Sequence, residues 1–429
     1  MKVLVLGSGG REHALIWKLS QDRSVTDLYC LPGNDAISAI AHAIPGNPVD
    51  PQVVLDATRA IQADLVVVGP EAPLFSGVTD ALRAAGVDVF GPSREAAAIE
   101  GSKAFAKEFM ARHRIPTARF GVFRELGPAV DFIRELGGRC VVKASGPALG
   151  KGVVVAEDEQ AAVAAAEAML VQGSFGEAGR EVVVEERLEG EEVSFLVITD
   201  GERIVPLLAA QDHKRIGDRD TGPNTGGMGA ITPVPWWTPA LQTEVTERII
   251  TPALAGLKAE GRPYAGVLYA GLMITRDGPV VLEFNARFGD PETQPIMRLL
   301  DADLGQLLYQ AATGHLEADE VSWYRGAAAG VVLAAGGYPG EYRRGDVIEG
   351  LDAAARVPGV TIFHAGTRRE GDRWLTNGGR VLNVVARGRD LAAALEKAYQ
   401  ACGMIHWPGM QYRHDIGRRA LSEGHGTGK

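Results

Sequence analysis

Cysteine is scarce in this sequence and long apolar runs are missing, and each lack excludes a class of protein. Cys30, Cys140 and Cys402 are the only cysteines in 429 residues, and none lies in a CxxC pair. This spacing argues against a zinc site or a disulfide framework, so we expect three reduced cysteines that pack in cores. No run approaches the roughly 20 apolar residues of a membrane helix. A strand pattern begins directly after Met1, where a signal peptide would stand, so we expect a cytoplasmic protein.

Basic blocks are also missing. The formal net charge is −10, and the lysines and arginines are dispersed along the chain. A nucleic-acid surface needs clustered positive charge, so we expect small-molecule substrates, no nucleic acid, no membrane and no obligatory protein partner. An anionic substrate must then be bound by local Lys, Arg and backbone N–H groups. The length allows two to four domains, and 46% hydrophobic with 23% charged residues is typical of a globular protein.

The most informative stretch is 279–297, PVVLEFNARFGDPETQPIM. Its start predicts a strand, in which Glu283 and Asn285 point to the same face because side chains alternate with a period of two. Two oxygen ligands on one face suit Mg²⁺, which binds one or two protein oxygens together with phosphates and waters. Arg287 follows at the same period and would join them if the strand continues. These residues alone also fit an edge strand with a solvated glutamate and a surface arginine.

The N-terminus predicts a parallel α/β domain. The strand at 2–6 is followed by the turn GSGG and a helix that begins near Arg11, which is a ready anion site. A dinucleotide-binding fingerprint needs a third glycine where Glu12 stands and an acidic residue at the end of the second strand, near 28–31. Both departures favour a phosphate over NAD. Further strands at 64–69 and 87–91 alternate with expected helices at 36–43, 51–62 and 79–85.

The carboxyl ends of these parallel strands meet at one edge of the sheet. Gly9, Asn34 and Glu71 would lie at that edge. Tight turns and helix caps are the alternative interpretation, most clearly for Asn34.

A second region begins with a helix at Ser102. A lysine in the first turn of a helix is not favoured by the helix dipole, so Lys103 is expected to reach for an anion, although composition alone fits a solvated lysine. A strand that ends at Lys143 and a strand at 153–156 form a predicted hairpin with a glycine-rich loop at 144–152. Its backbone N–H groups could cover a triphosphate, and a flexible hairpin is the alternative. It is not a Walker loop, because no helix follows the loop.

Residues 211–230 are polar, glycine-rich and without period, and so long a loop in a compact enzyme is usually functional. His213 could be a base in this loop, but a structural hydrogen bond is the favoured interpretation. From 325 onward short strands at 328–333, 361–364 and 381–386 and a helix at 391–401 predict a small closing domain, with a frayed tail after it. The spacing of Cys402 and His406 indicates packing rather than metal binding.

Four separated blocks now agree: GSGGREHA, the hairpin at 141–152, DHKR…NTGGMG, and LEFNARFGDPETQ. In these blocks, over nearly its whole length, the chain resembles the phosphoribosylamine–glycine ligases, which are ATP-grasp enzymes. The strand at 267–274 has no acidic residue, a gap that these ligases share among ATP-grasp relatives. The resemblance implies an α/β and α+β multidomain fold. It comprises an N-terminal parallel α/β domain at 1–102, a two-lobed ATP-grasp domain at 103–320 with a lid at about 117–190, a small C-terminal α/β domain at 325–421, and a tail at 422–429.

The resemblance also implies roles for single residues. Ser145 and Pro147 stand where the family more often has Asp and an apolar residue, which leaves the behaviour of the lid loop open. The acidic run at 181–192 would otherwise be a solvated turn, but it matches the hinge in which Glu185 lies at the adenine and Glu192 at the ribose. Glycine recognition is expected in 211–230 and near Asp290. The implied ATP-binding residues are Lys103, Lys143, Gly150, Lys151, Gly152, Glu185, Leu188 and Glu192; the substrate-binding residues are Gly9, Asn34, Glu71, Asp212, Lys214 and Arg287; the catalytic residues are Arg287, Lys143 and Asp290; and Glu283 and Asn285 hold Mg²⁺ or Mn²⁺.

The reaction implied is the ATP-dependent joining of glycine to 5-phosphoribosylamine through glycyl phosphate, an early step of purine synthesis that yields glycinamide ribonucleotide, ADP and phosphate. Two alternatives stay open. A related ATP-grasp ligase of the purine pathway could activate a different carboxylate, although it would lack the RFGDPETQ and NTGGMG blocks. A catalytically silent nucleotide-binding regulator could keep the fold, although the intact Glu283, Asn285 and Arg287 speak against it.

Overall fold

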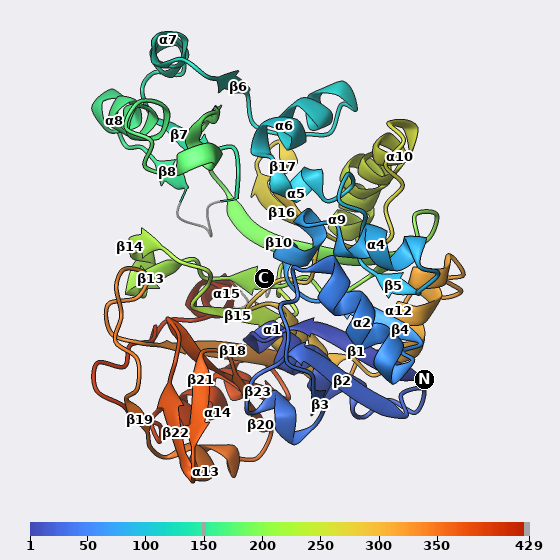
Figure 1. The fold of residues 1–429 in the computed structure, drawn as a ribbon. Helices are drawn as coiled ribbons and strands as arrows, with labels where there is room; N and C mark the ends of the chain where they lie inside the picture. Colours follow the sequence, from blue (N-terminus) through green and yellow to red (C-terminus); the bar gives the residue numbers. More distant parts are fainter. Residues whose placement is uncertain (148–151, 424–429) are drawn as a thin grey trace.

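The N-terminal domain is a parallel sheet covered by helices. The computed structural model describes residues 1–147 and 152–423 (Figure 1). The sheet has the strand order β3-β2-β1-β4-β5 and all of its pairs are parallel, so the predicted fold of this domain is confirmed. Its strands are β1 (Lys2–Gly7), β2 (Asp27–Pro32), β3 (His42–Ala43), β4 (Leu65–Val68) and β5 (Val89–Phe90), and its helices are α1 (Gly10–Leu19), α2 (Pro51–Ile61), α3 (Glu71–Phe75) and α4 (Val78–Ala84).

The helix predicted at 36–43 is wrong, whereas those at 51–62 and 79–85 are confirmed. The segment forms only a 3₁₀ turn, η1 (Ile37–Ala39), before it enters the edge strand β3. The Asn34 side-chain oxygen accepts hydrogen bonds from the backbone N–H groups of Ala36 and Ile37, at 3.0 and 2.9 Å. Asparagine thereby offers the backbone a turn instead of a helix. The backbone N–H of Ile44 then donates to the Cys30 carbonyl and holds the chain at the sheet edge.

The second region has two lobes, as predicted. After α5 (Ala98–Gly101) and α6 (Lys103–Arg112), a small lobe is built on an antiparallel sheet of order β6-β9-β7-β8. It has a hydrophobic core of its own between the sheet and two helices, and in Figure 1 it projects from the rest of the molecule. The predicted hairpin is β7 paired with β8. The lobe contains β6 (Phe120–Phe123), α7 (Leu126–Glu135), β7 (Cys140–Ala144), β8 (Val153–Val155), α8 (Glu159–Leu170), η2 (Gly176–Gly179) and β9 (Val182–Glu186).

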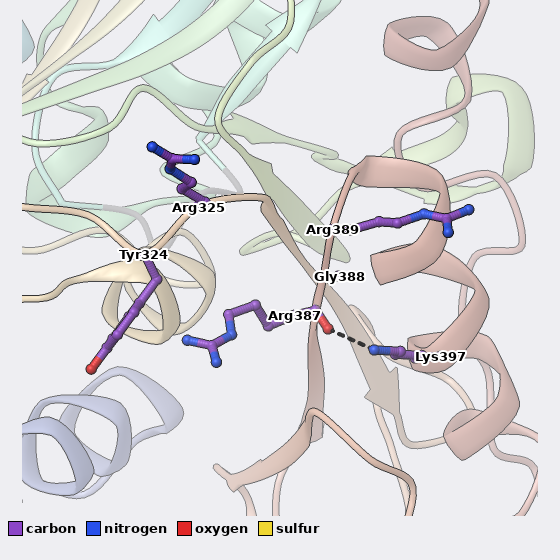
Figure 2. A pocket seen from close by; sticks show the side chains of 6 residues that line it. All are labelled: Tyr324, Arg325, Arg387, Gly388, Arg389 and Lys397. Atoms are coloured by element: carbon purple, nitrogen blue, oxygen red, sulfur yellow. Dashed lines mark hydrogen bonds between the residues drawn. The ribbon is translucent and has the colours of Figure 1, made fainter.

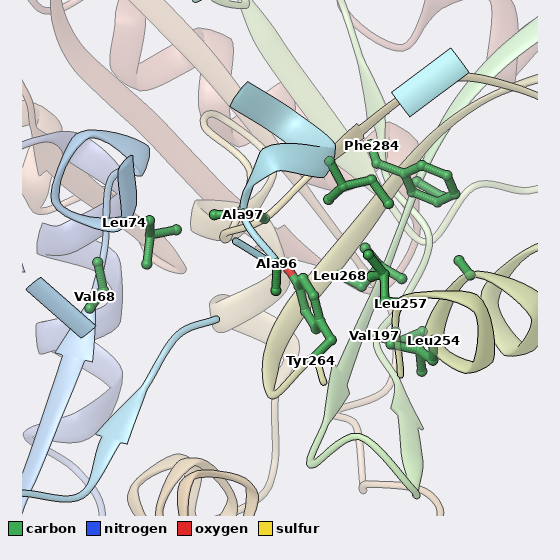
Figure 3. Close-up of a cluster of buried hydrophobic side chains, with 14 of the residues drawn as sticks. Val68, Leu74, Ala96, Ala97, Val197, Leu254, Leu257, Tyr264, Leu268 and Phe284 are labelled. Atoms are coloured by element: carbon green, nitrogen blue, oxygen red, sulfur yellow. The ribbon is translucent and has the colours of Figure 1, made fainter. Parts of the chain in front are cut away.

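The large lobe packs directly on the N-terminal domain. Its sheet has the order β11-β10-β16-β17. One buried cluster contains side chains of the first domain, such as Val68 and Leu74, together with Leu254 and Leu268 of this lobe (Figure 3). The two parts therefore share a core. The lobe comprises β10 (Glu191–Thr199), β11 (Ile204–Pro206), α9 (Pro239–Val245), the π-helix η4 (Thr246–Ile250), α10 (Thr251–Ala259), β16 (Gly266–Thr275), β17 (Gly278–Asn285), α11 (Thr293–Leu299) and α12 (Leu304–Thr313).

The C-terminal domain confirms the predicted short strands and helix, and it also recruits the stretch 211–230. That stretch, predicted as one loop, contains β12 (Gln211–Asp212), β13 (Arg215–Gly217), η3 (Asp218–Asp220), β14 (Thr221–Asn224) and β15 (Gly229–Thr232). Strands β12 and β15 join a sheet of order β12-β15-β18-β23-β20. The other elements are β18 (Ala327–Ala334), β19 (Val347–Ile348), α13 (Leu351–Ala355), β20 (Val360–His364), β21 (Thr367–Glu370), β22 (Arg373–Thr376), β23 (Arg380–Gly388), α14 (Leu391–Cys402) and α15 (Arg418–Glu423).

The three cysteines are free and buried, as predicted, and burial raises the thiol pKa values of Cys30 and Cys140 to about 11 and of Cys402 to about 12. The backbone of His406 pairs with that of Glu349. In the described part of the chain, no cluster of three or more His, Cys, Asp or Glu side chains is placed to hold a metal ion. None of its helices is long and apolar enough to cross a membrane.

Two buried histidines join the N-terminal and C-terminal domains. The His13 Nδ1 atom accepts a hydrogen bond of 2.9 Å from the backbone N–H of His364, and the His13 ring packs edge-on against Phe363. Burial lowers the pKa of His13 to about 4, and burial together with the nearby His13 lowers the pKa of His364 to about 3. Both rings are therefore neutral in the folded protein at neutral pH.

We predict that the free energy of unfolding decreases as the pH falls from about 6.5 towards 4. In this window the unfolded histidines bind protons at their ordinary pKa near 6.5, whereas the folded ones do not, so acid favours unfolding. Chemical denaturation at a series of pH values measures the slope. His13→Asn keeps an acceptor for His364 but does not titrate, so its slope should be shallower, whereas the exposed His315→Asn should match the wild type. Equal slopes in all three proteins would contradict the prediction.

Candidate active site

The predicted metal residues lie at the end of β17. Asn285 is buried, and its side-chain oxygen accepts a hydrogen bond of 3.1 Å from the Arg287 guanidinium. Glu283 is partly exposed, with the Lys214 ammonium 4.0 Å from its carboxylate. Burial raises the pKa of Glu283, but the charges of Lys214, Lys143 and Lys103 outweigh it and lower that pKa. Glu283 is therefore an ionised carboxylate within a group of cations.

Arg287 reaches the same place without lying on the strand, because β17 ends at Asn285. Its guanidinium forms an ion pair of 2.9 Å with Glu100 of α5 and lies 3.5 Å from Glu71 of α3. The other Glu100 oxygen accepts a hydrogen bond from the backbone N–H of Ala286. Burial lowers the Arg287 pKa, but these carboxylates raise it above its ordinary value. Glu100 holds the predicted catalytic arginine, and the sequence analysis did not identify it.

Two buried lysines share Glu185, the predicted adenine-side residue. The carboxylate forms ion pairs with Lys143 of β7 and with Lys107 of α6, and the Lys107 ammonium also donates to the Thr117 hydroxyl at 2.7 Å. Burial lowers the pKa of Lys107 to about 8, against the opposing charge of Glu185. Lys107 was not among the predicted site residues, although its spacing of four from Lys103 indicates the same helix face.

Lys103 contacts the hairpin. Its ammonium donates to the Gly146 carbonyl at 3.4 Å, and no carboxylate lies within ion-pair distance of it in residues 1–147 and 152–423. Ser145, one of the two departures from the family, accepts a hydrogen bond from the Ala104 backbone N–H with its side-chain oxygen. It therefore attaches the hairpin to the start of α6. The predicted residues Gly150 and Lys151 lie outside the described residues, whereas the Gly152 carbonyl accepts from Ala144.

A small hollow lies between the predicted ribose and substrate residues. It is lined by Glu192, Ser194, Asp212 and Lys214 and by apolar parts of β10, β16 and β17. The Lys214 ammonium forms an ion pair of 3.1 Å with Glu192, and this carboxylate raises the Lys214 pKa. Leu188 is half-buried in the turn before β10. Lys214 thus lies between the predicted ribose residue and the predicted metal residue.

At the edge of the N-terminal sheet, some polar groups of the predicted substrate residues form hydrogen bonds within the protein. The Gly9 backbone N–H donates to the buried Glu12 carboxylate at 2.7 Å, and a β-carbon at Gly7 or Gly69 would lie within 2.6 Å of Glu12 atoms. Glu12 therefore caps its own helix in the position where a dinucleotide fingerprint has glycine. The Asn34 amide donates to the carbonyls of Ser8 and His364. Glu71 is better placed for its predicted role in substrate binding, because its carboxylate faces Arg287.

Asp290 and His213 lie where the C-terminal domain meets these residues. The Asp290 carboxylate is 3.3 Å from the Arg380 guanidinium and accepts a hydrogen bond from Gln294. Burial raises the Asp290 pKa, but Arg380 and Arg11 outweigh it and lower that pKa. No motif in the sequence pointed to Arg380. The His213 ring contacts only backbone, with Nε2 accepting from Gly417 and Nδ1 lying 3.2 Å from the Gly229 carbonyl, which agrees with a structural hydrogen bond.

A second hollow, of about 260 Å³, lies on the C-terminal domain and has no residue of the predicted site in its lining. Four cations line it, but they do not converge. Figure 2 shows Arg387 directed towards Tyr324 while Arg389 points away on the opposite side. Diverging charges do not form one anion site, so the candidate active site is the group around β17.

The chain is similar to known proteins over its whole length. Three family models for phosphoribosylglycinamide synthetase match it: the N domain at residues 1–100, the ATP-grasp (A) domain at 101–293 and the C domain at 328–419. A phosphoribosylamine–glycine ligase of Vibrio cholerae is 51% identical over 428 residues, covering 98% of this chain and 99% of that protein. The enzyme of Escherichia coli K12 is 50% identical over 425 residues, again covering 98% and 99%.

Solved structures agree. The crystal structure of a phosphoribosylamine–glycine ligase from Thermotoga maritima matches with a TM-score of 0.85 and 33% identity, covering 97% of this chain and 100% of that one. A biotin carboxylase domain from Hydrogenobacter thermophilus matches with a TM-score of 0.72 at 18% identity, covering 96% and 91%. The second likeness shows the shared ATP-grasp fold alone.

We predict that Glu100→Gln lowers the free energy of unfolding by about 3 kcal/mol, because it leaves a buried guanidinium with only the more distant Glu71. Chemical denaturation measures the change. Glu95→Gln, an exposed glutamate in the same segment, is the matched control and should change stability by no more than about 0.5 kcal/mol. A Glu100→Gln protein as stable as the control would show that this ion pair does not stabilise the fold.

Proposed function

The chain belongs to the phosphoribosylglycinamide synthetase family, and from that premise we propose that it ligates glycine to 5-phosphoribosylamine with ATP in purine biosynthesis, in the cytoplasm. The observation that carries this proposal is the convergence on the end of β17. Lys103 approaches Glu283 from α6, Lys143 from the small lobe and Lys214 from the C-terminal side. Arg287 links the end of this strand to the N-terminal domain. Cations from three parts of the chain around one carboxylate suit a nucleotide triphosphate.

ATP is proposed to bind between the lobes. Lys103 has no ion-pair partner among the described residues, and Lys143 has its ammonium beside Glu185 and the Leu282 carbonyl, so both are placed for phosphate oxygens. Glu192 and Leu188 would hold the ribose and adenine side, next to the buried Glu185. The hairpin loop with Gly150, Lys151 and Gly152 would cover the phosphates, and the lobe at about 117–190 would act as the lid.

The residues at the end of β17 fit a hard divalent metal ion. Glu283 is ionised and partly exposed, and Asn285 adds a neutral amide oxygen two positions on. Two protein oxygens are the usual protein share of a Mg²⁺ site that also binds phosphates, and Mn²⁺ accepts the same donors. When bound, the metal would polarise the terminal phosphoryl group of ATP.

The ligation needs no covalent bond to the protein. A glycine carboxylate oxygen forms a bond to the γ-phosphorus, the bond to ADP breaks, and Lys103 and Lys143 stabilise the charge of the transferring group. The amine of phosphoribosylamine then attacks the carbonyl carbon of glycyl phosphate, the bond from this carbon to the phosphate oxygen breaks, and the proton that the amine loses leaves with the phosphate, whose remaining negative charge Arg287 stabilises. Closure of the lid would exclude water, because an acyl phosphate hydrolyses in its presence.

The phosphoribosylamine is proposed to lie at the edge of the N-terminal sheet, with Gly9, Asn34, Glu71 and Asp290 around it. A β-carbon at Gly9 would be 3.8 Å from the Asp290 carboxylate, so the strand end of β1 and the turn after β17 lie together. Glu71 and Arg287 link this edge to the end of β17. The acceptor amine and the acyl phosphate would therefore meet beside Arg287.

Release of ADP tests the function. We predict release from ATP and Mg²⁺ only when glycine and phosphoribosylamine, generated in situ, are both present, and not when either is omitted. A panel of other small carboxylates is the comparison. Release with another carboxylate in place of glycine would refute the substrate, and nucleotide binding without release in any mixture would favour a regulator.

We predict that Glu283→Ala reduces turnover at least about a hundred-fold, because it removes the charged ligand at the phosphoryl group. The fold should persist, since this side chain is partly exposed and has no hydrogen bond from the described residues. Asp277→Ala, in the exposed turn before the same strand, is the matched control and should keep full activity. Near-normal turnover of Glu283→Ala, with an unchanged requirement for Mg²⁺, would remove the metal assignment.

A further inference from the structure

A buried glutamate next to the site has one oxygen without a partner. Glu292 is 2% exposed, and its Oε1 atom accepts hydrogen bonds from the hydroxyl groups of Ser194 and Tyr269, at 2.9 and 2.6 Å. No donor in residues 1–147 and 152–423 forms a hydrogen bond with its Oε2 atom, and this oxygen is not fully buried. An oxygen that is neither fully buried nor hydrogen-bonded within the protein is free to accept a hydrogen bond from a ligand.

The surroundings of this oxygen are kept open by glycines and lead to the hollow of the active site. A β-carbon at Gly289 would lie 2.6 Å from Glu292 Oε2, and a β-carbon at Gly227 would lie 2.7 Å from Asp212 Oδ1. Ser194, which binds Glu292, also lines the hollow together with Asp212. The free oxygen is thus close to the space between the ribose side and β17.

A second carboxylate faces the same space. Burial and the charge of Glu292 raise the pKa of Asp212 well above its ordinary value, against the opposing charges of Lys214 and Arg380. Two neighbouring carboxylates repel each other, and a cation between them relieves this repulsion. Lys214 forms an ion pair with Glu192, and Arg380 forms one with Asp290, so neither supplies this cation.

The size and charge of the missing group follow from its neighbours. It must carry several N–H donors and a positive charge, and it must be small enough to enter between side chains. Arg287 is near enough for its pKa to be raised further by Glu292 and Tyr269, so a carboxylate held at Arg287 and an ammonium held at Glu292 could belong to one short molecule. A zwitterionic α-amino acid has this arrangement of charges.

We propose that Glu292, together with Asp212, binds the ammonium group of glycine and selects an amino acid over a plain carboxylate. This inference rests on the proposed ligase function. Ser194 and Tyr269 fix the Glu292 carboxylate so that Oε2 is directed at the ammonium, while the glycine carboxylate lies towards Arg287 and the γ-phosphoryl group. The glycine then enters with its charges aligned.

Steady-state kinetics of Glu292→Gln in the full chain test this assignment. The amide keeps the size of the side chain and an acceptor for Ser194 and Tyr269, but it loses the negative charge. The KM for glycine should rise about ten-fold or more, the loss expected for a charge-assisted hydrogen bond, while the KM values for ATP and phosphoribosylamine should change less than about two-fold. Asp212→Asn should act in the same direction, and it provides the same test if Glu292→Gln does not fold. Glu247→Gln, an exposed helical glutamate, should match the wild type.

A second measurement separates ammonium binding from packing. Glycolate carries a hydroxyl where glycine carries its ammonium, so the ratio of ADP release with glycine to that with glycolate reports the charge recognition. This ratio should fall about ten-fold in Glu292→Gln. An unchanged ratio, or a rise in the KM for phosphoribosylamine instead of glycine, would overturn the proposal. Absence of glycine-dependent release in the wild-type protein would instead refute the ligase function itself.

Discussion

A buried guanidinium must be neutralised, and in this protein that requirement joins the first domain to the catalytic strand. Arg287 follows β17, but the carboxylates that neutralise it, Glu71 and Glu100, come from helices more than 180 positions earlier. Glu100 also holds the backbone of Ala286, so the turn after β17 is attached to the N-terminal domain at two atoms. The shared hydrophobic core around Leu74 and Leu268 supports this attachment. The edge that would receive the acceptor amine is therefore fixed relative to the strand that would hold the metal.

The positive charges of the lysines on the other side of the site are neutralised less completely than that of Arg287. Burial and the charge of Lys143 lower the pKa values of Lys103 and Lys107, but only Lys107 and Lys143 have a carboxylate in contact, and they share Glu185. Three positive charges thus have one contacting carboxylate among the described residues, and Lys103 is left without a counter-ion in contact. A triphosphate would supply that counter-ion. Burial is the larger cause of the lowered Lys107 pKa, and the positive charge of Lys143 lowers it further.

Features that depend on neighbouring residues, such as the strand β17, could be predicted from the sequence, whereas contacts between distant residues could not. The strand that alternation predicted over Glu283 and Asn285 is present as β17, and the role of these two residues at a metal stays a prediction. The same reasoning included Arg287 only if the strand continued that far, and the strand ends at Asn285. The helix predicted at 36–43 failed because the Asn34 side chain competes for backbone N–H groups, an effect that apolar spacing does not reveal. Glu100, Arg380 and Glu292 were not predicted. Each of them contacts a partner that lies far away in the sequence, and a local sequence pattern does not show such a pair.

The stretch 211–230 shows why such partners matter for the chemistry. Its strands β12 and β15 belong to the sheet of the C-terminal domain, and the buried Arg413 ties Asp220 of this stretch to Asp415 near the end of the chain. Asp212 and Lys214 are therefore held by the C-terminal domain, while the small lobe with the hairpin has a separate core. A lobe with its own core can move as a unit without disturbing side chains that it does not contact. If this lobe is the proposed lid, it could open and close while the side chains of the proposed amino-acid site keep their positions relative to Arg287, as the proposed acyl phosphate would require.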